Sequence, residues 1–130
     1  MSQTIPESHR DLLTQPLVAT FISIMPDGKP HGSVVWCRQN GNDIQVAILN
    51  DTQKYQNLLS NPEVSLLIVD TNEPYRYLEV RGTSHMSKDN ATTIITDIAR
   101  KYGRPEFDVK TNESKRFIVT IIPSKVIVHG

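Results

Sequence analysis

The chain has 130 residues, of which 38% are hydrophobic and 22% charged, which is the size and composition of one ordinary globular domain. The 14 basic and 14 acidic side chains cancel, so no overall field recruits a nucleic acid or an anionic membrane, and any anion site must be local. No stretch approaches the roughly 18 consecutive apolar residues of a membrane span, and the N-terminus does not resemble a signal peptide. We therefore expect a single domain over residues 1–130 in a soluble, cytoplasmic protein.

Hydrophobic periodicity and turn residues divide the chain into short elements. The predicted elements, in chain order, are a short helix after a capping-box pattern at 4–7, strands at 17–25, 31–38 and 44–48, a helix between 52 and 61, strands at 63–70 and 75–86, a helix at 91–102, and a strand at 115–129 bent at Pro123. Six or seven strands with about three helices predict a mainly β (α+β) fold, a closed or nearly closed antiparallel barrel decorated by helices.

Two strands carry apolar residues without alternation, at 66–69 and at 117–119. A small barrel buries only its inner face, so the outer face of such strands needs another partner. A second copy of the chain is the simplest partner, and we predict a homodimer.

The single cysteine, Cys37, follows the apolar residues 34–36, a setting typical of a buried free thiol rather than a reactive one. A free thiol is compatible with a reducing cytoplasm. His9, His31, His85 and His129 show no metal-ligand spacing, so we assign no metal.

The segment from residue 50 to 54 combines the end of a strand, a hydroxyl residue that can cap a helix, and a lysine in the first helical turn. Free backbone N–H groups and the helix dipole favour an anion at such a point, and Lys54 adds a full charge. The pattern indicates a phosphate site, although a lysine in a first turn is also commonly just solvated. Trp36 fits either the core or the side of a planar ligand, and Arg76 fits either a ligand or a solvated loop.

Several segments in this order resemble the split β-barrel flavoproteins related to pyridoxamine 5′-phosphate oxidase, in particular their flavin/deazaflavin F420-dependent oxidoreductase branch. They are residues 26–30 (PDGKP), 33–36 (SVVW), 52–54 (TQK) with 57–58 and 61–62, and 75–82 (YRYLEVRG). The resemblance implies a split barrel, and a homodimer that holds FMN or F420 at the subunit interface. It places the phosphate against Thr52 and Lys54 and the ring along the strand from Ser33 to Trp36, with Arg76 and Tyr77 reaching the ring region from the partner chain. The residues that it assigns to the cofactor are Ser33, Val34, Val35, Trp36, Thr52, Lys54, Asn57, Arg76 and Tyr77.

The departures from the family pattern concern the reaction. Pyridoxamine phosphate oxidases carry arginines where Ser33 and Gln53 stand here, and an arginine-bearing C-terminal segment that residues 126–130 do not provide. We therefore do not expect oxidation of pyridoxamine 5′-phosphate. The resemblance implies hydride transfer between FMN or F420 and a small conjugated substrate, chemistry that the cofactor itself supplies, so no catalytic acid or base is assigned.

The polyanionic tail of F420 would require a local basic groove, for which five residues are candidates: Arg38, Lys54, Arg76, Arg81 and Lys88. The sequence does not choose between FMN and F420. The alternatives to an enzyme are a non-catalytic flavin- or haem-binding module, because haem-handling relatives of this barrel exist, and a structural dimer without a ligand.

Overall fold

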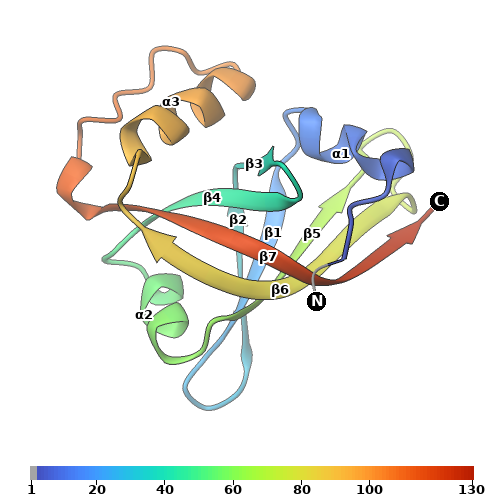
Figure 1. Cartoon of the computed structure of the whole chain (residues 1–130), viewed down its shortest axis with the longest axis horizontal. Coiled ribbons are helices and arrows are strands. Elements are labelled where there is room, and N and C mark those ends of the chain that lie inside the picture. Colours follow the sequence, from blue (N-terminus) through green and yellow to red (C-terminus); the bar gives the residue numbers. More distant parts are fainter. Residues whose placement is uncertain (1–2) are drawn as a thin grey trace.

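The computed structural model describes residues 3–130 and shows a strongly curled sheet with helices at its open side and ends (Figure 1). The strands are β1 Ala19–Ile24, β2 Pro30–Val35, β3 Cys37–Asn40, β4 Asp43–Leu49, β5 Glu63–Val69, β6 Tyr77–Ser87 and β7 Arg116–His129. The α-helices are α1 Asp11–Thr14, α2 Gln53–Ser60 and α3 Ala91–Lys101, and the short 3₁₀ turns are η1 Glu7–His9 and η2 Glu113–Lys115.

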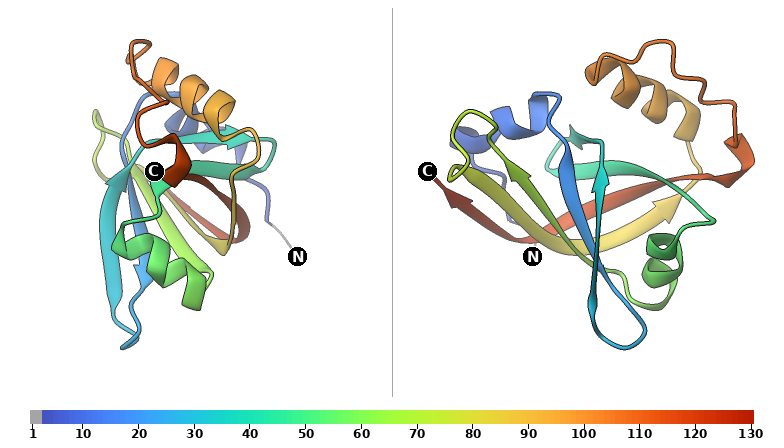
Figure 2. Two further views of the ribbon diagram at one scale, coloured as in Figure 1. Left: turned by 90° about the vertical axis from the view of Figure 1, so that its left-hand side faces the viewer. Right: turned by 180° about the vertical axis from the view of Figure 1, so that it is seen from behind.

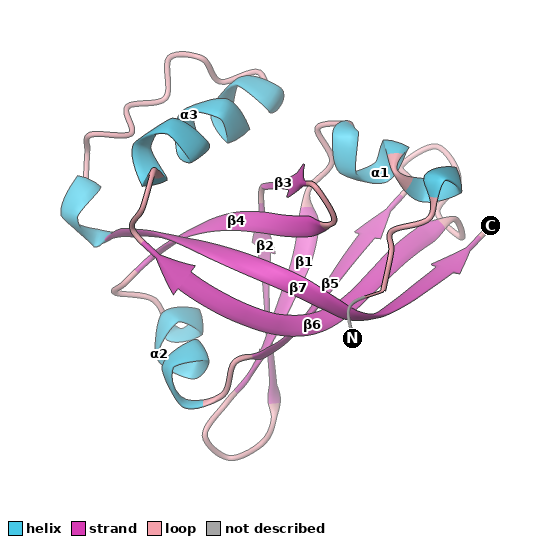
Figure 3. Ribbon diagram, in the orientation of Figure 1, coloured by secondary structure: helices cyan, strands magenta, loops and turns pink. Residues whose placement is uncertain are grey.

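All seven strands form one antiparallel sheet in the order β2-β1-β5-β6-β7-β4-β3 (Figure 3). The alternating residues of each strand turn one face inward, where Phe21, Ile44, Leu66 and Leu78 are fully buried. The mainly β, seven-stranded split barrel with three α-helices is thus confirmed. None of the described helices is long and apolar enough to cross a membrane.

The strand predicted over residues 31–38 is two strands, because the chain changes partner at Trp36. Val35 pairs with Ala19 of β1, whereas Cys37 pairs with Val46 of β4. β2 and β3 therefore lie at the two opposite ends of the sheet order, joined by Trp36 alone. This single residue spans the split of the barrel.

The long strand β7 follows β6 with one irregularity, between Arg81 and Gly82. A Cβ atom on Gly82 would stand 2.2 Å from the backbone oxygen of Ile122, so only glycine permits this close approach of the two strands. The irregularity lies next to Pro123, as predicted for the bend in β7.

Helix α3 covers the outer face of β4 and β7. Ile94, Ile95 and Ile98 of α3 pack against Ile118, and Trp36 and Ala47 join this second cluster. The apolar residues at 117–119 are therefore covered within the chain, and they no longer argue for a second copy. The outer face of β1, β2 and β5 is different, because Ile22 and Leu67 stay half-buried and Val34 is 67% exposed.

The N-terminal capping box is not formed. The first turn, η1, begins after Pro6, and α1 begins after Arg10, and neither cap position makes a side-chain hydrogen bond. Pro6 has an extended backbone, ψ 139°, which delays the first turn to Glu7. Buried Ile5, Leu12 and Leu13 instead fix this segment by packing against the barrel core.

Candidate functional site

The start of α2 meets the middle of β2 through one side-chain contact. Lys54 Nζ donates a hydrogen bond to Ser33 Oγ at 3.3 Å. Ser33 lies directly opposite buried Phe21 in the ladder, so its side chain points toward the inner side of the sheet, where α2 lies. Figure 2 shows α2 beside β2 in both of its views.

A cavity of about 250 Å³ lies at this split. Its walls come from β2, β4 and α2, and its lining residues are Val34, Val35, Trp36, Ala47 and Lys54. Four of these five were predicted from the sequence. We call this cavity the Lys54 pocket.

The ammonium of Lys54 is incompletely satisfied. Burial lowers the pKa of Lys54, because removing a charge from water disfavours the charged form. Over residues 3–130, its side chain has only the Ser33 hydroxyl as hydrogen-bond partner and forms no ion pair. An ammonium has three N–H donors, so two are left for a ligand, and an anion would also offset the cost of burial.

Thr52 acts as the cap of α2. Its hydroxyl donates to the Leu49 carbonyl at 2.7 Å and accepts from the Tyr55 N–H at 3.4 Å. The hydroxyl proton of Thr52 is therefore committed to the protein, and the helix start leaves its first N–H groups without partners inside the helix. The predicted cap is present, and any direct ligand contact by the Thr52 side chain would have to use its oxygen as an acceptor.

Asn57 lies away from the Lys54 pocket. It is 1% exposed, and it donates to Ser23 Oγ at 3.0 Å and accepts from Gln53 Nε2 at 2.8 Å. The bond to Ser23 fastens α2 to β1 inside the barrel, whereas the bond from Gln53 lies within α2. Asn57 is thus placed to position α2 and not to line the pocket.

Trp36 is engaged on one face. Its ring stacks on Tyr102 with centroids 5.0 Å apart and planes within 8°, and Phe107 meets it in an edge-on arrangement at 6.2 Å. Trp36 therefore packs under α3, as predicted for a core residue, and it also lines the pocket. Its place beside a planar ligand stays a prediction.

Arg76 and Tyr77 lie at the other end of the barrel in the single chain. Arg76 forms ion pairs with Asp11 at 2.7 Å and Asp70 at 3.0 Å, which raise its pKa, and it lines a separate cavity of about 360 Å³. Tyr77 stacks on His129 with centroids 5.3 Å apart. Their predicted contact with the cofactor requires a partner chain, so it stays a prediction.

The five basic candidates for a groove are not brought together. Each lines a different cavity: Lys54, Arg38, Arg76, Arg81 and Lys88. Three of them are also neutralised by carboxylates, because Arg38 pairs with Asp97, Arg76 with Asp11 and Asp70, and Arg81 with Glu79. One chain on its own therefore does not form the basic groove that the sequence suggested.

Comparison with known proteins identifies the family. The family model for pyridoxamine 5′-phosphate oxidase matches residues 5–130. The chain belongs to the pyridoxamine 5′-phosphate oxidase family. Among proteins of curated function, no sequence matches this chain significantly.

Solved structures with the same fold include proteins of different kinds. An F420 reductase is 28% identical with a TM-score of 0.87, covering 95% of this chain and 98% of its own. A conserved hypothetical protein from Mycobacterium tuberculosis is 22% identical with a TM-score of 0.79, covering 97% and 85%. The haem storage protein HutZ from Vibrio cholerae is 16% identical with a TM-score of 0.77, covering 98% and 96%. This pyridoxamine 5′-phosphate oxidase family fold therefore serves both a reductase and a haem store.

For this member of the pyridoxamine 5′-phosphate oxidase family, sequence reasoning missed Ala47. It lies in β4 opposite Ile118 and gives the Lys54 pocket one of its walls. The available signal was a small residue at the centre of the otherwise large-residue strand 44–49. A larger side chain there would narrow the pocket.

Proposed function

We propose that this protein is a homodimeric oxidoreductase that transfers hydride between FMN or F420, bound in the Lys54 pocket, and a small conjugated substrate. The observation that carries the proposal is the half-buried ammonium of Lys54, whose partner among residues 3–130 is the Ser33 hydroxyl. A cation in this setting fits a phosphate group, which both cofactors contain.

The rest of the pocket fits a planar ring. β2 ends the sheet order, so one edge of this strand has no neighbour in the described chain and its backbone groups on that side can bond a ligand. Val34, Val35 and Ala47 offer apolar surface beside this edge. When bound, the flavin or deazaflavin supplies the hydride chemistry, whereas Lys54 and Ser33 hold the phosphate and the β2 backbone orients the ring.

Of the two cofactors, F420 has the better support, because the F420 reductase is 28% identical to this chain over nearly its whole length. The dimer is supported by the outer face of β1, β2 and β5, where Ile22, Leu67 and Val34 form an incompletely covered apolar surface. The contact of the cofactor with Arg76 and Tyr77 of a partner chain, which the family resemblance implies, is part of this proposal.

The test begins with the visible absorption spectrum of the purified protein. The cofactor-free protein is then titrated with F420 and with FMN while deazaflavin or flavin fluorescence is followed, and riboflavin serves as the control that lacks a phosphate. Saturable binding of F420 or FMN near one per chain, with riboflavin bound at least about tenfold more weakly, is expected. Absence of binding by both cofactors would overturn the proposal.

Turnover separates an enzyme from a store. The bound cofactor should be reduced by a nicotinamide nucleotide, or enter already reduced as F420, and then be reoxidised by an added conjugated acceptor. A protein that binds flavin or haem with no such cycling is the alternative, a non-catalytic binding module. Light scattering on the same sample measures the mass, which should be twice that of one chain.

A further inference from the structure

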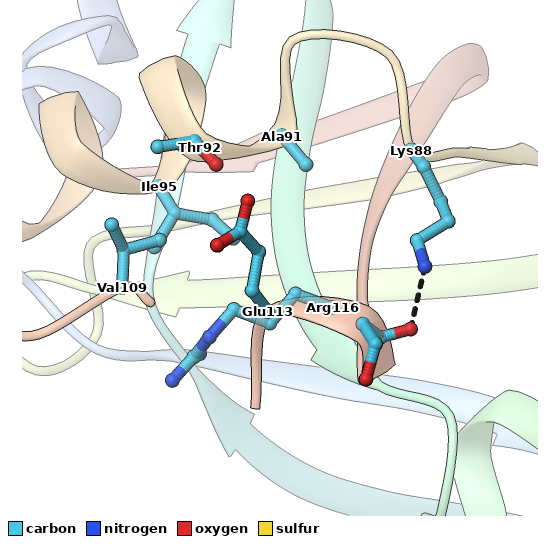
Figure 4. Close-up of a pocket in the computed structure, with 8 residues that line it drawn as sticks. Lys88, Ala91, Thr92, Ile95, Val109, Glu113 and Arg116 are labelled. Atoms are coloured by element: carbon cyan, nitrogen blue, oxygen red, sulfur yellow. Dashed lines mark hydrogen bonds between the residues drawn. The ribbon is translucent and has the colours of Figure 1, made fainter. Parts of the chain in front are cut away.

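A second cavity, of about 440 Å³, lies between α3 and the segment that leads into β7. Its lining residues are Lys88, Ala91, Thr92, Ile95, Val109, Glu113, Ser114 and Arg116. The volume is within the range of small-molecule sites, and none of these residues lines the Lys54 pocket. We call it the α3 cavity, and Figure 4 shows its lining.

Three charged side chains line the α3 cavity without neutralising one another. Lys88 Nζ donates to the Ser114 carbonyl and lies 5.2 Å from the Phe117 ring centre. Arg116 Nε donates to the Thr111 carbonyl at 2.9 Å, and its guanidinium lies 4.9 Å from the Phe107 ring centre. Both cations are thus held in place by neutral groups, with N–H donors to spare.

The carboxylate of Glu113 makes neither a hydrogen bond nor an ion pair within residues 3–130. In Figure 4 it points up toward α3, between Ile95 and Ala91, while Arg116 extends away from it and Lys88 reaches down to the Ser114 carbonyl. Some basic side chains elsewhere do pair with carboxylates, as Arg76 does with Asp11 at 2.7 Å and Arg81 with Glu79 at 2.9 Å. Opposite charges that line one cavity and remain unpaired complement a ligand that carries both.

Of the other five lining residues, Thr92 and Ser114 are polar, and Ala91, Ile95 and Val109 are apolar. Ile95 is almost fully buried, and Ala91 and Val109 pack against the same cluster beneath α3. A ligand that paired its charges with the rim would therefore set its hydrocarbon part against these three side chains, where burial is favourable.

We propose that the α3 cavity binds a zwitterion with an apolar side chain, of the class of an apolar amino acid or a short apolar peptide. Its ammonium pairs with Glu113, its carboxylate with Lys88 or Arg116, and its side chain packs on Ala91, Ile95 and Val109. The site uses no residue of the proposed cofactor pocket, so it stands whether or not a flavin binds.

Calorimetric titration with three related probes tests this. The probes are leucyl-leucine, its N-acetyl derivative without the ammonium, and its C-terminal amide without the carboxylate. Saturable binding of leucyl-leucine, with each blocked form bound about tenfold or more weakly, is expected from the loss of one charge-assisted contact. A protein that fails to bind leucyl-leucine, or binds all three probes equally, overturns the proposal.

Charge-removing variants locate the site. Glu113→Gln should weaken leucyl-leucine about tenfold and leave the N-acetyl form unchanged. Lys88→Gln or Arg116→Gln should weaken the carboxylate-bearing probes and leave the amide unchanged. Lys29→Gln, in the exposed β1–β2 turn, is the matched control and should bind as the native protein does. Native-like binding by all three cavity variants would place the probe elsewhere and overturn the proposal.

Discussion

Lys54 and Lys101 are both half-buried lysines, and burial lowers the pKa of each, yet their surroundings differ. Lys101, at the end of α3, donates to the carbonyls of Leu13 and Cys37, the latter at 2.6 Å, and lies 5.0 Å from the Tyr102 ring centre. Lys54, at the start of α2, has a hydroxyl at 3.3 Å. The Lys101 ammonium therefore joins three segments of the chain, whereas the Lys54 ammonium retains donors for a ligand.

The region around Lys101, which we call the α1–α3 corner, holds the fold together, whereas the region around Lys54, which we call the α2 corner, is the candidate site. At the α1–α3 corner, the two neighbours Lys101 and Tyr102 satisfy backbone groups of Leu13, Leu17 and Cys37. At the α2 corner, the helix is fastened by Asn57 inside the barrel, which frees Lys54 from a structural task. A similar degree of burial therefore does not define a lysine's role, whereas the number and kind of its acceptors does.

The largest expected effect is on stability at the α1–α3 corner. Lys101→Met retains the aliphatic stem but leaves two carbonyls without their donor, and we expect the free energy of unfolding to fall by about 2 kcal/mol. Urea unfolding measures it. The matched variant, Lys54→Met, should change this free energy by less than about 0.5 kcal/mol. Equal losses in the two variants would remove the distinction between the corners.

The second prediction concerns cofactor affinity, which should depend on Lys54 and not on Lys101. Lys54→Met should weaken FMN or F420 binding by about 1–3 kcal/mol, the range of a charge-assisted hydrogen bond, because the phosphate loses its cation. Fluorescence titration gives the dissociation constant, and the melting temperature of the cofactor-free variant should stay near that of the native protein. Lys101→Met, assayed under conditions where it is folded, should keep native affinity. An unchanged affinity in Lys54→Met would show that the phosphate assignment is wrong.

A third variant asks whether Lys101 acts alone. Tyr102→Phe keeps the ring stacked on Trp36 but removes the bond to the Leu17 carbonyl at 2.6 Å and the acceptor of the Cys37 N–H at 3.1 Å. We expect a loss of about 1 kcal/mol in the free energy of unfolding. Tyr75→Phe, at a side chain that is 84% exposed, is the control and should have no measurable effect. If Tyr102→Phe left the free energy of unfolding unchanged, the stability of the α1–α3 corner would depend on Lys101 alone.

The smallest effect concerns pH. Burial raises the pKa of the Cys37 thiol from its ordinary 9.0, so above this pH the unfolded chain releases a proton that the folded chain keeps, and stability falls as the pH rises. The lowered pKa values of Lys54 and Lys101 act in the opposite direction below 10.5. Comparison with Cys37→Ala isolates the thiol. Between about pH 8 and about pH 10, the native protein should lose stability relative to the variant, by less than about 1.4 kcal/mol per pH unit. If the stability of the native protein and that of Cys37→Ala changed in parallel with pH, the Cys37 thiol would not be the cause of the loss.

Sequence patterns predicted the elements well where burial repeats with a fixed period. The faces of β6 and the apolar stripe of α3 follow periods of 2 and 3.6, which depend only on local geometry. The break at Trp36 was missed because Val35, Trp36 and Cys37 all favour strands, and nothing local records that the pairing partner changes from β1 to β4. The change follows from the closure of the whole sheet.

In the candidate site, too, local features could be predicted from the sequence, whereas contacts between distant segments could not. The cap at Thr52 and the nearby Lys54 could be seen in one short segment, and the structure adds the contact with Ser33, 21 residues away. Lys101 gave no comparable signal, because a lysine at a helix end is ordinary and its acceptors at residues 13 and 37 are distant in the chain. Contacts between distant segments are set by topology, which a single sequence does not display.

The free edge of β2 also bears on solubility. An unpaired strand edge is a template for pairing with other chains, and aggregation begins at such edges when they are long, flat and apolar. β2 has six residues, begins with Pro30, which lacks an N–H, and contains Gly32, which weakens strand pairing. The edge that we propose for the ring is therefore poorly suited to recruit foreign strands, and the cofactor-free protein should remain in solution.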